Sequence, residues 1–173
     1  MAKINKRPVI FPLSNPVSQA ECTFEDAIEY TDGRVLFASG SPFDPVVYNG
    51  KTMVAGQGNN LYAFPPIGLA AILARVKSIP EEMIIASAEA LSTTLTESEK
   101  ERNLLYPELG RIRDVSVRCA AAVIRAAQKA GVDQNAQLRN MDDQALLKFI
   151  QARMWHPLLQ SSAELPPQHD SPK

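Results

Sequence analysis

The sequence has few of the side chains from which proteins build metal sites and catalytic triads. It contains two histidines and two cysteines among 173 residues. His156 follows the last predicted helix and His169 lies in a polar C-terminal stretch, and neither is near a cysteine or a carboxylate cluster. Cys22 and Cys119 are too few for a disulfide framework and lack the spacing of a zinc site. We therefore expect no metal site and no Ser-His-Asp triad within this chain, and we interpret each cysteine as a buried thiol in a reducing compartment.

Strong net charge and long apolar runs are also missing, and we expect no leader sequence. The formal net charge is -1, which does not support a nucleic-acid-binding surface. No stretch approaches the roughly 20 apolar residues of a membrane span, and the polar residues after Met1 predict neither a signal peptide nor a transit peptide. We expect a cytoplasmic protein, with the mitochondrial matrix as the other possibility. Apolar residues make up 45% and charged residues 21% of the chain, as in globular proteins, and its length is sufficient for one domain with a core.

Glycine-rich phosphate-binding turns are absent as well. Gly56 and Gly58 form a Gly-x-Gly, but Leu61 occupies the third glycine position of the dinucleotide fingerprint, and no predicted strand leads directly into it. Two adjacent amides, Asn59 and Asn60, follow instead, and each can donate and accept hydrogen bonds. They precede a predicted helix, whose free N–H groups favour anions. An ordinary turn is the simpler interpretation of this stretch taken alone. The alternative is a site where uncharged amides bind a small anionic substrate.

Apolar runs and turn residues predict a strand–helix–strand order in the first part of the chain. Pro12 cannot donate to a sheet ladder, so the first strand either ends there or has one side free. Near-continuous apolar strands that alternate with helices are typical of a parallel sheet covered by helices. The predicted elements are a strand over residues 7–13, a helix capped by Thr23 and running to Tyr30, a strand over 35–39, and a hairpin over 46–54 with an Asn49-Gly50 turn.

The remainder is predicted to be helical, over residues 66–76, 80–94, 110–130 and 141–155, with a short segment capped by Thr96 and Glu99. The helix over 110–130 has two stripes. The apolar stripe contains Ile112, Val115, Cys119, Val123 and Ala126. The basic stripe contains Arg111, Arg118, Arg125 and Lys129, and we expect it to be solvated. We divide the chain into an α/β part (residues 1–131), a C-terminal helical segment (132–160) and a disordered tail (161–173).

Three polar loops follow strands or lead into a helix: Ser14-Asn15-Pro16, Gly40-Ser41-Pro42 and Gly58-Asn59-Asn60. Ligands of open α/β sheets bind beyond the carboxyl ends of the strands. If these loops converge at that edge, they form a ligand site. The alternative is that all three are plain connections.

Six short motifs resemble those of the malic enzymes, in the same order: Arg7-Pro8-Val9-Ile10-Phe11, Leu13-Ser14-Asn15-Pro16, Ala20-Glu21-Cys22-Thr23, Leu36-Phe37-Ala38-Ser39-Gly40-Ser41-Pro42-Phe43-Asp44-Pro45, Gly56-Gln57-Gly58-Asn59-Asn60 and Leu105-Tyr106-Pro107. The resemblance runs from about Ala2 to the region of His156. It implies oxidative decarboxylation of (S)-malate to pyruvate and carbon dioxide, with NAD or NADP and a magnesium or manganese ion. It also implies an incomplete Rossmann-like, doubly wound sheet with a helical C-terminal extension.

The resemblance further implies that this region is the C-terminal part of a longer subunit. The family's catalytic tyrosine and lysine, its metal ligands and its glycine-rich turn lie upstream of the position that matches Met1. We therefore expect no catalytic residue and no metal ligand in this chain, and no activity from it alone. Asn15, Asn59 and Asn60 resemble the amides that hold malate, and Ser14 and Asn15 lie where the family's strand end faces the nicotinamide.

The implied partners are malate or pyruvate and further copies of the subunit, while NAD and NADP remain equally open. The alternative is a non-catalytic protein that reuses this half-domain for binding or for association with intact subunits. The sequence departs from the family pattern at four positions. Pro12 replaces a small residue, Val17 a threonine, Pro66 a glycine, and Glu108 the second proline after the tyrosine.

Overall fold

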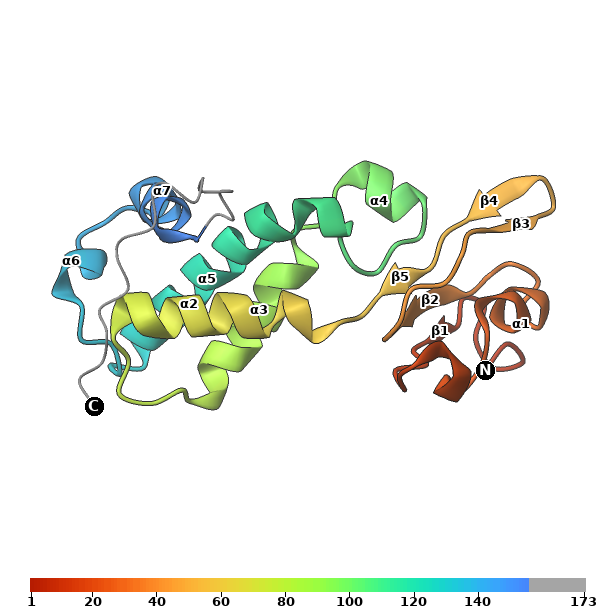
Figure 1. Cartoon of the computed structure of the whole chain (residues 1–173), viewed down its shortest axis with the longest axis horizontal. Coiled ribbons are helices and arrows are strands. Elements are labelled where there is room, and N and C mark those ends of the chain that lie inside the picture. The colour runs from red at the N-terminus through yellow and green to blue at the C-terminus, as the bar shows by residue number, and fades with distance from the viewer. Residues whose placement is uncertain (156–173) are drawn as a thin grey trace, which may run out of the picture.

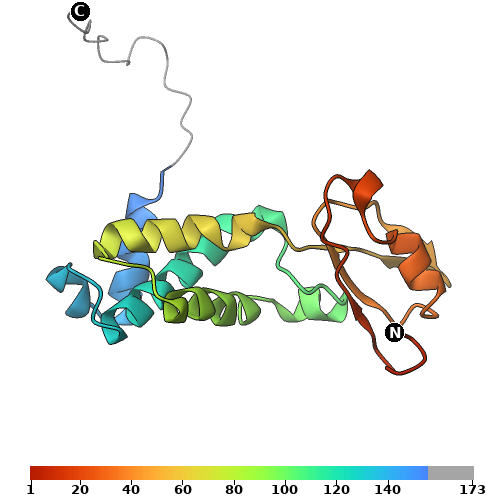
Figure 2. The same ribbon diagram turned by 90° about the horizontal axis from the view of Figure 1, so that it is seen from below.

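The computed structural model describes residues 1–155 and consists of an α/β lobe followed by a helical lobe (Figure 1). The predicted tail over 161–173 and both histidines lie outside the described residues. The α/β lobe contains the strands and helix α1 (Phe24–Glu29), and helix α2 (Phe64–Ala74) begins the helical lobe. Figure 2 shows that the chain passes between the lobes before α2 and again around the short helix α4 (Glu97–Glu101).

The α/β lobe is built on a parallel sheet of three strands, as the apolar runs predicted. Its order is β1 (Val9–Ile10), β2 (Leu36–Ser39) and β5 (Gly56–Gln57). Val9 lies opposite Leu36 in one pair, and Ala38 lies opposite Gly56 in the other. Strand β5 was not predicted, because two residues with a glycine carry no strand pattern. This strand lies within the Gly-x-Gly itself, and residues 54–55 before it belong to no strand, so no strand leads directly into the Gly-x-Gly, as expected.

Strand β1 is shorter than the predicted strand over 7–13. Pairing with β2 nevertheless extends beyond both of its ends, because Leu36 N donates to Pro8 O at 2.8 Å and Gly40 N donates to Pro12 O at 3.2 Å. Pro12 has no N–H with which to return a bond, so the regular ladder stops. Since β1 pairs only with β2, its other edge is unpaired among the described residues.

Helix α1 and a hairpin cover one face of the sheet. Thr23 caps α1 and forms a capping box with Asp26. The hairpin joins β3 (Val46–Tyr48) to β4 (Lys51–Met53), and the turn residues Asn49 (φ +49°) and Gly50 (φ +76°) have the left-handed geometry that favours this pair. The apolar residues of this cluster are Phe24, Ala27, Ile28, Val35 and Phe37, with Ile10, Phe43, Val46, Tyr48 and Met53 at its rim.

The helices of the second lobe lie within a few residues of their predicted bounds. They are α2, α3 (Glu81–Ser92), α4, α5 (Ile112–Lys129) and α7 (Asp143–Arg153). Gly131 (φ +68°) follows the end of α5 and has the left-handed geometry typical of a helix C-terminus. The polar stretch 133–140 contains a further short helix, α6 (Ala136–Arg139). No helix among the described residues is long and apolar enough to cross a membrane.

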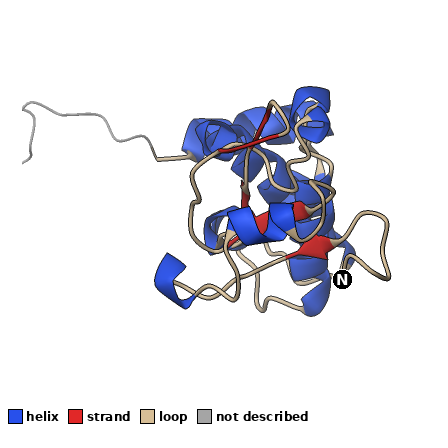
Figure 3. Cartoon of the chain, turned by 90° about the vertical axis from the view of Figure 1, so that its right-hand side faces the viewer, coloured by secondary structure: helices blue, strands red, loops and turns tan. Residues whose placement is uncertain are grey.

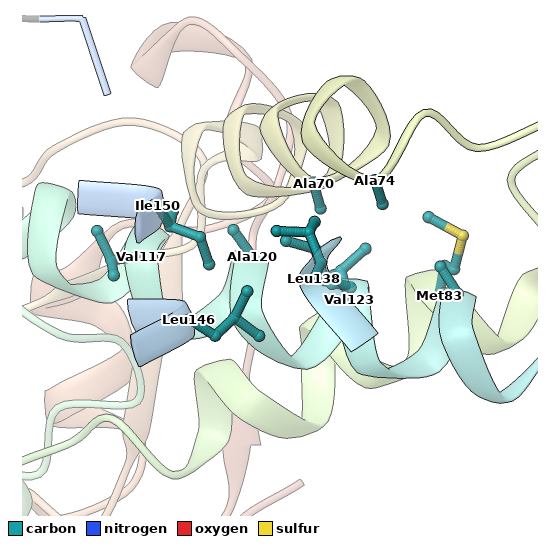
Figure 4. Packing of buried hydrophobic residues seen from close by; sticks show 11 residues of the cluster. Ala70, Ala74, Met83, Val117, Ala120, Val123, Leu138, Leu146 and Ile150 are labelled. Carbon is teal, nitrogen blue, oxygen red and sulfur yellow. The ribbon is translucent and has the colours of Figure 1, made fainter. Parts of the chain in front are cut away.

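One apolar core holds the helical lobe together (Figure 4). It combines Ala70 and Ala74 of α2 with Met83 of α3, and it continues through α5, α6 and α7. Leu138, Leu146 and Ile150 are each fully buried in it. This core therefore draws side chains from both sides of residue 131.

Two expectations about individual side chains are wrong. Cys119 is buried, and this burial raises its thiol pKa to about 11, but Cys22 is only partly buried. The basic stripe of α5 is not uniformly solvated. Arg111 donates to the carboxylate of the buried Glu99 at 2.6 Å, and Arg125 donates to the backbone oxygen of Met141 at 2.6 Å. Both guanidinium groups bond to residues of other elements, and the sequence pattern of one helix cannot predict such partners.

Candidate functional site

The three polar loops lie at the same edge of the sheet, as the parallel strand pattern predicted. Asn15 follows β1, Gly40 follows β2 and Gly58 follows β5. Hydrogen bonds continue the pairing into the loops, because Gly40 N donates to Pro12 O and Gly58 N donates to Ser39 O at 2.8 Å. Figure 3 shows the lobe that carries this edge nearest the viewer. Because all three strands are parallel, this is the carboxyl edge, where α/β proteins bind ligands.

Gly40 allows the loop after β1 to come very close to the end of β2. A Cβ atom at this position would lie 2.5 Å from Leu13 O and 2.8 Å from the amide nitrogen of Asn15. Both distances are shorter than any real Cβ contact, so only glycine fits without a backbone shift. The Asn15 amide therefore packs against the backbone of residue 40.

Two of the predicted site amides have their oxygen atoms occupied by internal donors. The hydroxyl of Ser41 donates to Asn15 Oδ1. The backbone N–H of Leu61 donates to Asn59 Oδ1 at 3.0 Å, so that Asn59 caps the 3₁₀ turn η2 (Asn60–Tyr62). Each amide therefore keeps its NH₂ group, which only donates, for a ligand.

Asn60 and Ser14 have different surroundings. Asn60 is exposed at the first position of η2, and its backbone oxygen accepts from Ala63 N at 3.0 Å. The Ser14 hydroxyl donates to the carboxylate of Glu21 at 2.7 Å. That bond lowers the pKa of Glu21. Ser14 thus lies at the predicted edge, but its hydroxyl already has a partner.

Aromatic side chains support the loop that carries Asn59. Tyr62 is buried, its hydroxyl donates to the backbone oxygen of Pro107, and its burial raises its pKa to about 12. Its ring lies 5.6 Å from that of Tyr106, centroid to centroid. A Cβ at Gly58 would lie 3.2 Å from the Tyr106 ring, so the glycine lets loop and ring approach closely. The Leu105-Tyr106-Pro107 motif was visible in the sequence, but nothing there showed that it lies behind the glycine loop.

The predicted amides of the site are neutral donors. No Lys or Arg in the described part of the chain forms a hydrogen bond with Asn15, Asn59 or Asn60. Within residues 1–155 there is also no group of three or more His, Cys, Asp or Glu side chains that could hold a metal ion. The described residues therefore offer neutral donors to an acceptor-rich ligand, and their carboxylates do not fit a metal centre.

Comparison with known proteins identifies relatives of this chain. The sequence profile described as "Malic enzyme, NAD binding domain" matches residues 1–128. The NADP-dependent malic enzyme of Dictyostelium discoideum is 48% identical over 151 residues, which cover 87% of this chain and 27% of that protein. The NADP-dependent malic enzyme of Vitis vinifera is 42% identical over 161 residues, which cover 93% of this chain and 27% of that protein. The chain thus spans about a quarter of the length of these relatives.

Solved structures show the same fold. The malic enzyme from Pyrococcus horikoshii Ot3 superposes with a TM-score of 0.59 at 27% identity, over 82% of this chain and 28% of that one. The Entamoeba histolytica malic enzyme gives 0.58 at 22% identity, a likeness of fold alone. These neighbours confirm the α/β, Rossmann-like class, and the profile and relatives confirm the resemblance in the loop motifs. The chain belongs to the malic enzyme family.

Proposed function

We propose that this chain forms the substrate-gripping edge of a malic enzyme, which oxidatively decarboxylates (S)-malate to pyruvate and carbon dioxide with NAD(P)⁺. One observation carries the proposal. Asn15 and Asn59, at the carboxyl edge of the parallel sheet, have acceptor atoms occupied from within the chain and NH₂ donors left for a ligand. Two such donors suit the oxygens of a carboxylate or a hydroxyl group. The names of the relatives, NADP-dependent malic enzymes, supply the substrate.

The neutrality of these amides fits the reaction. Asn15 and Asn59 hold the substrate oxygens without adding a full charge beside the carbon that loses hydride. Asn60, exposed beside Asn59, adds a third amide within reach of the same edge. Because the three amides are neutral, the charge of the substrate has to be balanced by other groups.

The cofactor proposal rests on the position of the loops. The carboxyl edge of a doubly wound sheet receives the nicotinamide end of a dinucleotide, and Ser14 and Asn15 follow β1 at that edge. NADP⁺ is favoured over NAD⁺ because the relatives from Dictyostelium and Vitis are named for it. When bound, the dinucleotide accepts the hydride, while this chain's part is to orient the substrate beside it.

The proposal assigns the acid, the base and the magnesium or manganese ion to parts of the enzyme other than residues 1–155. Turnover by the isolated chain is therefore not expected. A cytoplasmic location and a homo-oligomeric enzyme also remain predictions.

A non-catalytic role in subunit association is the second candidate. The unpaired edge of β1 and the exposed Phe64 (69%) and Ile72 (75%) of the apolar helix α2 favour it. The two candidates differ in what they require of Asn59, since association through these surfaces does not need its amide.

The test replaces the matching segment of the Dictyostelium enzyme with residues 1–155 of this chain. The chimera should oxidise malate. Asn15→Ala or Asn59→Ala should each lower kcat/KM for malate by roughly 10- to 150-fold, because a hydrogen bond to a charged group contributes about 1.5–3 kcal/mol. Asn49→Ala, in the exposed hairpin turn, is the control and should leave kcat/KM within about twofold.

Steady-state kinetics with malate and NADP⁺ varied separately decide between the candidates. The NADP⁺ KM should change less for Asn59→Ala than for Asn15→Ala, which lies nearer the proposed nicotinamide position. A folded chimera without turnover, or an Asn59→Ala variant that keeps malate efficiency within about twofold, contradicts the proposal.

A further inference from the structure

Within residues 1–155, Ser41 is the one side chain that hydrogen-bonds the amide of Asn15. Asn15 lies in the loop after β1, and Ser41 lies in the loop after the neighbouring strand β2. The Ser41 hydroxyl donates to Asn15 Oδ1 across 26 residues of sequence. Ser41 itself is partly buried, and its backbone N–H lies 3.4 Å from the hydroxyl oxygen of the fully buried Ser39. The serine is thus held by β2, the central strand of the sheet, rather than by the loop that it contacts.

Packing limits where the Asn15 amide lies but does not decide which way it faces. A Cβ at residue 40 would lie 2.8 Å from Asn15 Nδ2 and 2.9 Å from Oδ1, so both ends of the amide lie equally close to the glycine backbone. An amide oxygen and an amide NH₂ group are also similar in size. The fit against residue 40 therefore does not favour one amide orientation over the other. Only the hydrogen-bond partners distinguish the two orientations.

The orientation matters because the two ends of the amide act oppositely on an anion. With Oδ1 toward Ser41, the NH₂ group faces the ligand and donates. In the reversed orientation Oδ1 faces the carboxylate, and the two oxygens repel each other. A hydroxyl at residue 41 gives Oδ1 a donor and so supports the productive orientation whenever a carboxylate takes the NH₂ group.

We propose that Ser41 is a positioning residue that orients the Asn15 amide with its NH₂ group toward the substrate carboxylate. This rests on the proposed function, because Asn15 must bind substrate for its orientation to matter. Ser41 need not touch malate itself. The loop after β2 thus contributes to substrate recognition through its neighbour, because the Ser41 hydroxyl remains a donor for Oδ1 once the ligand accepts from the NH₂ group.

The experiment uses the chimeric enzyme and a double-mutant cycle. Ser41→Ala should raise the malate KM by about 2- to 13-fold, the range of one neutral hydrogen bond, with kcat and the NADP⁺ KM within twofold. Ser41→Thr keeps the hydroxyl and should leave the malate KM within twofold. Ser98→Ala, at an exposed serine of α4, is the matched control and should change nothing. Melting temperatures of all variants establish that the changes are not losses of folded enzyme.

The double variant separates positioning from a direct role. In the Asn15→Ala background, Ser41→Ala should add less than a twofold change, whereas in the Asn59→Ala background its full effect should remain. The proposal is overturned if Ser41→Ala raises the malate KM equally in the presence and absence of the Asn15 amide. It is also overturned if Ser41→Ala changes the malate KM of the parent chimera by less than twofold, or if Ser41→Thr raises the malate KM as much as Ser41→Ala. If Asn15→Ala alone leaves kcat/KM for malate unchanged, the proposed function itself fails. If Asn15→Ala lowers kcat/KM for malate but Ser41→Ala does not change the malate KM, only the positioning role of Ser41 fails.

Discussion

Glu99 is a buried carboxylate that keeps its charge because donors surround it. Only 2% of its surface is exposed. It accepts from Thr96 N at 2.7 Å, Glu108 N at 2.9 Å and Arg111 at 2.6 Å. Burial alone would raise its pKa, but these hydrogen bonds outweigh burial and lower the pKa to about 2. The carboxylate thus links α4, the loop before α5 and the start of α5.

This environment predicts a pH-dependent contribution to stability. The folded pKa is depressed below the ordinary value of 4.5, so the stabilisation is present above pH 4.5 and is lost as the pH falls toward 2. Glu99→Gln should lower the unfolding free energy at pH 7 by about 3 kcal/mol, as when one partner of a buried pair is removed. The difference in unfolding free energy between the parent chain and the variant should become smaller between pH 5 and pH 3. Urea unfolding at pH 7, 5, 4 and 3 measures it.

Glu97 supplies the control for this experiment, on the same helix. It pairs with Lys100 at 2.8 Å, but its side chain is 83% exposed. Glu97→Gln should therefore change the unfolding free energy by less than about 1 kcal/mol. A Glu99→Gln gap that stays constant from pH 7 to pH 3 would show that the carboxylate is not the group being titrated.

At the scale of elements, the junction between α4 and α5 depends on a backbone N–H that the family pattern lacks. Where malic enzymes usually have a second proline after the tyrosine, this chain has Glu108. Its N–H donates to Glu99 Oε1 at 2.9 Å, and its own carboxylate pairs with Arg102 at 2.8 Å. The backbone of Glu108 has φ −64°, a value that proline also adopts. A proline at this position therefore fits the backbone and removes only the donor and the side chain.

Glu108→Pro should destabilise the chain by about 1–2 kcal/mol. Loss of a hydrogen bond to a charged group costs about 1.5–3 kcal/mol. Proline also lowers the conformational entropy of the unfolded chain, which stabilises the folded state by about 0.4–1 kcal/mol. Glu108→Ala is the comparison, because it keeps the N–H and loses only the half-exposed pair with Arg102, a change within about 1 kcal/mol. Thermal and urea melts of both variants measure the difference. Equal stability of the Pro and Ala variants would mean that the N–H contributes nothing.

At the scale of the whole molecule, the α/β lobe has an open sheet edge. In the described part of the chain, strand β1 pairs on one side only, and alternate residues in and after it, Val9, Phe11 and Leu13, are 40–52% exposed. The rings of Phe11 and Tyr106 pack in an edge-to-face arrangement, at 6.4 Å between centroids. Unpaired strands with apolar side chains pair with other chains.

We therefore expect the purified chain to associate as its concentration rises, to bind hydrophobic dyes and to be marginally stable. Val9→Lys places a charge on the open strand and should shift the chain toward the monomer, because charged edge residues oppose strand pairing. Ile4→Lys, at an 81% exposed position outside the sheet, is the control. Sedimentation velocity over a concentration series measures both. A parent chain that stays monomeric and melts sharply at high temperature would contradict this expectation.

Local patterns in the sequence were sufficient for most elements of this fold. The Asn49-Gly50 turn, the caps at Thr23 and Thr96 and the terminating Gly131 depend on atoms within a few residues of one another, so their chemistry is visible in the sequence. The same holds for the apolar runs of β2 and α5. The convergence of the three loops was also predictable, because parallel strands place their carboxyl ends at one edge.

Interactions between distant residues were decided only by the tertiary structure. Strand β5 exists because β2 offers it a free edge. Arg111 was expected to be solvated, but it bonds to the buried Glu99. Leu138 packs in the core although the residues around it in the sequence are mostly polar. The sequence showed that Asn15, Asn59 and Ser41 lie in polar loops of a malic enzyme, but not that a serine 26 residues away bonds to the Asn15 amide. Residue type and near neighbours determine local geometry, whereas the partner of a polar side chain depends on which elements pack together.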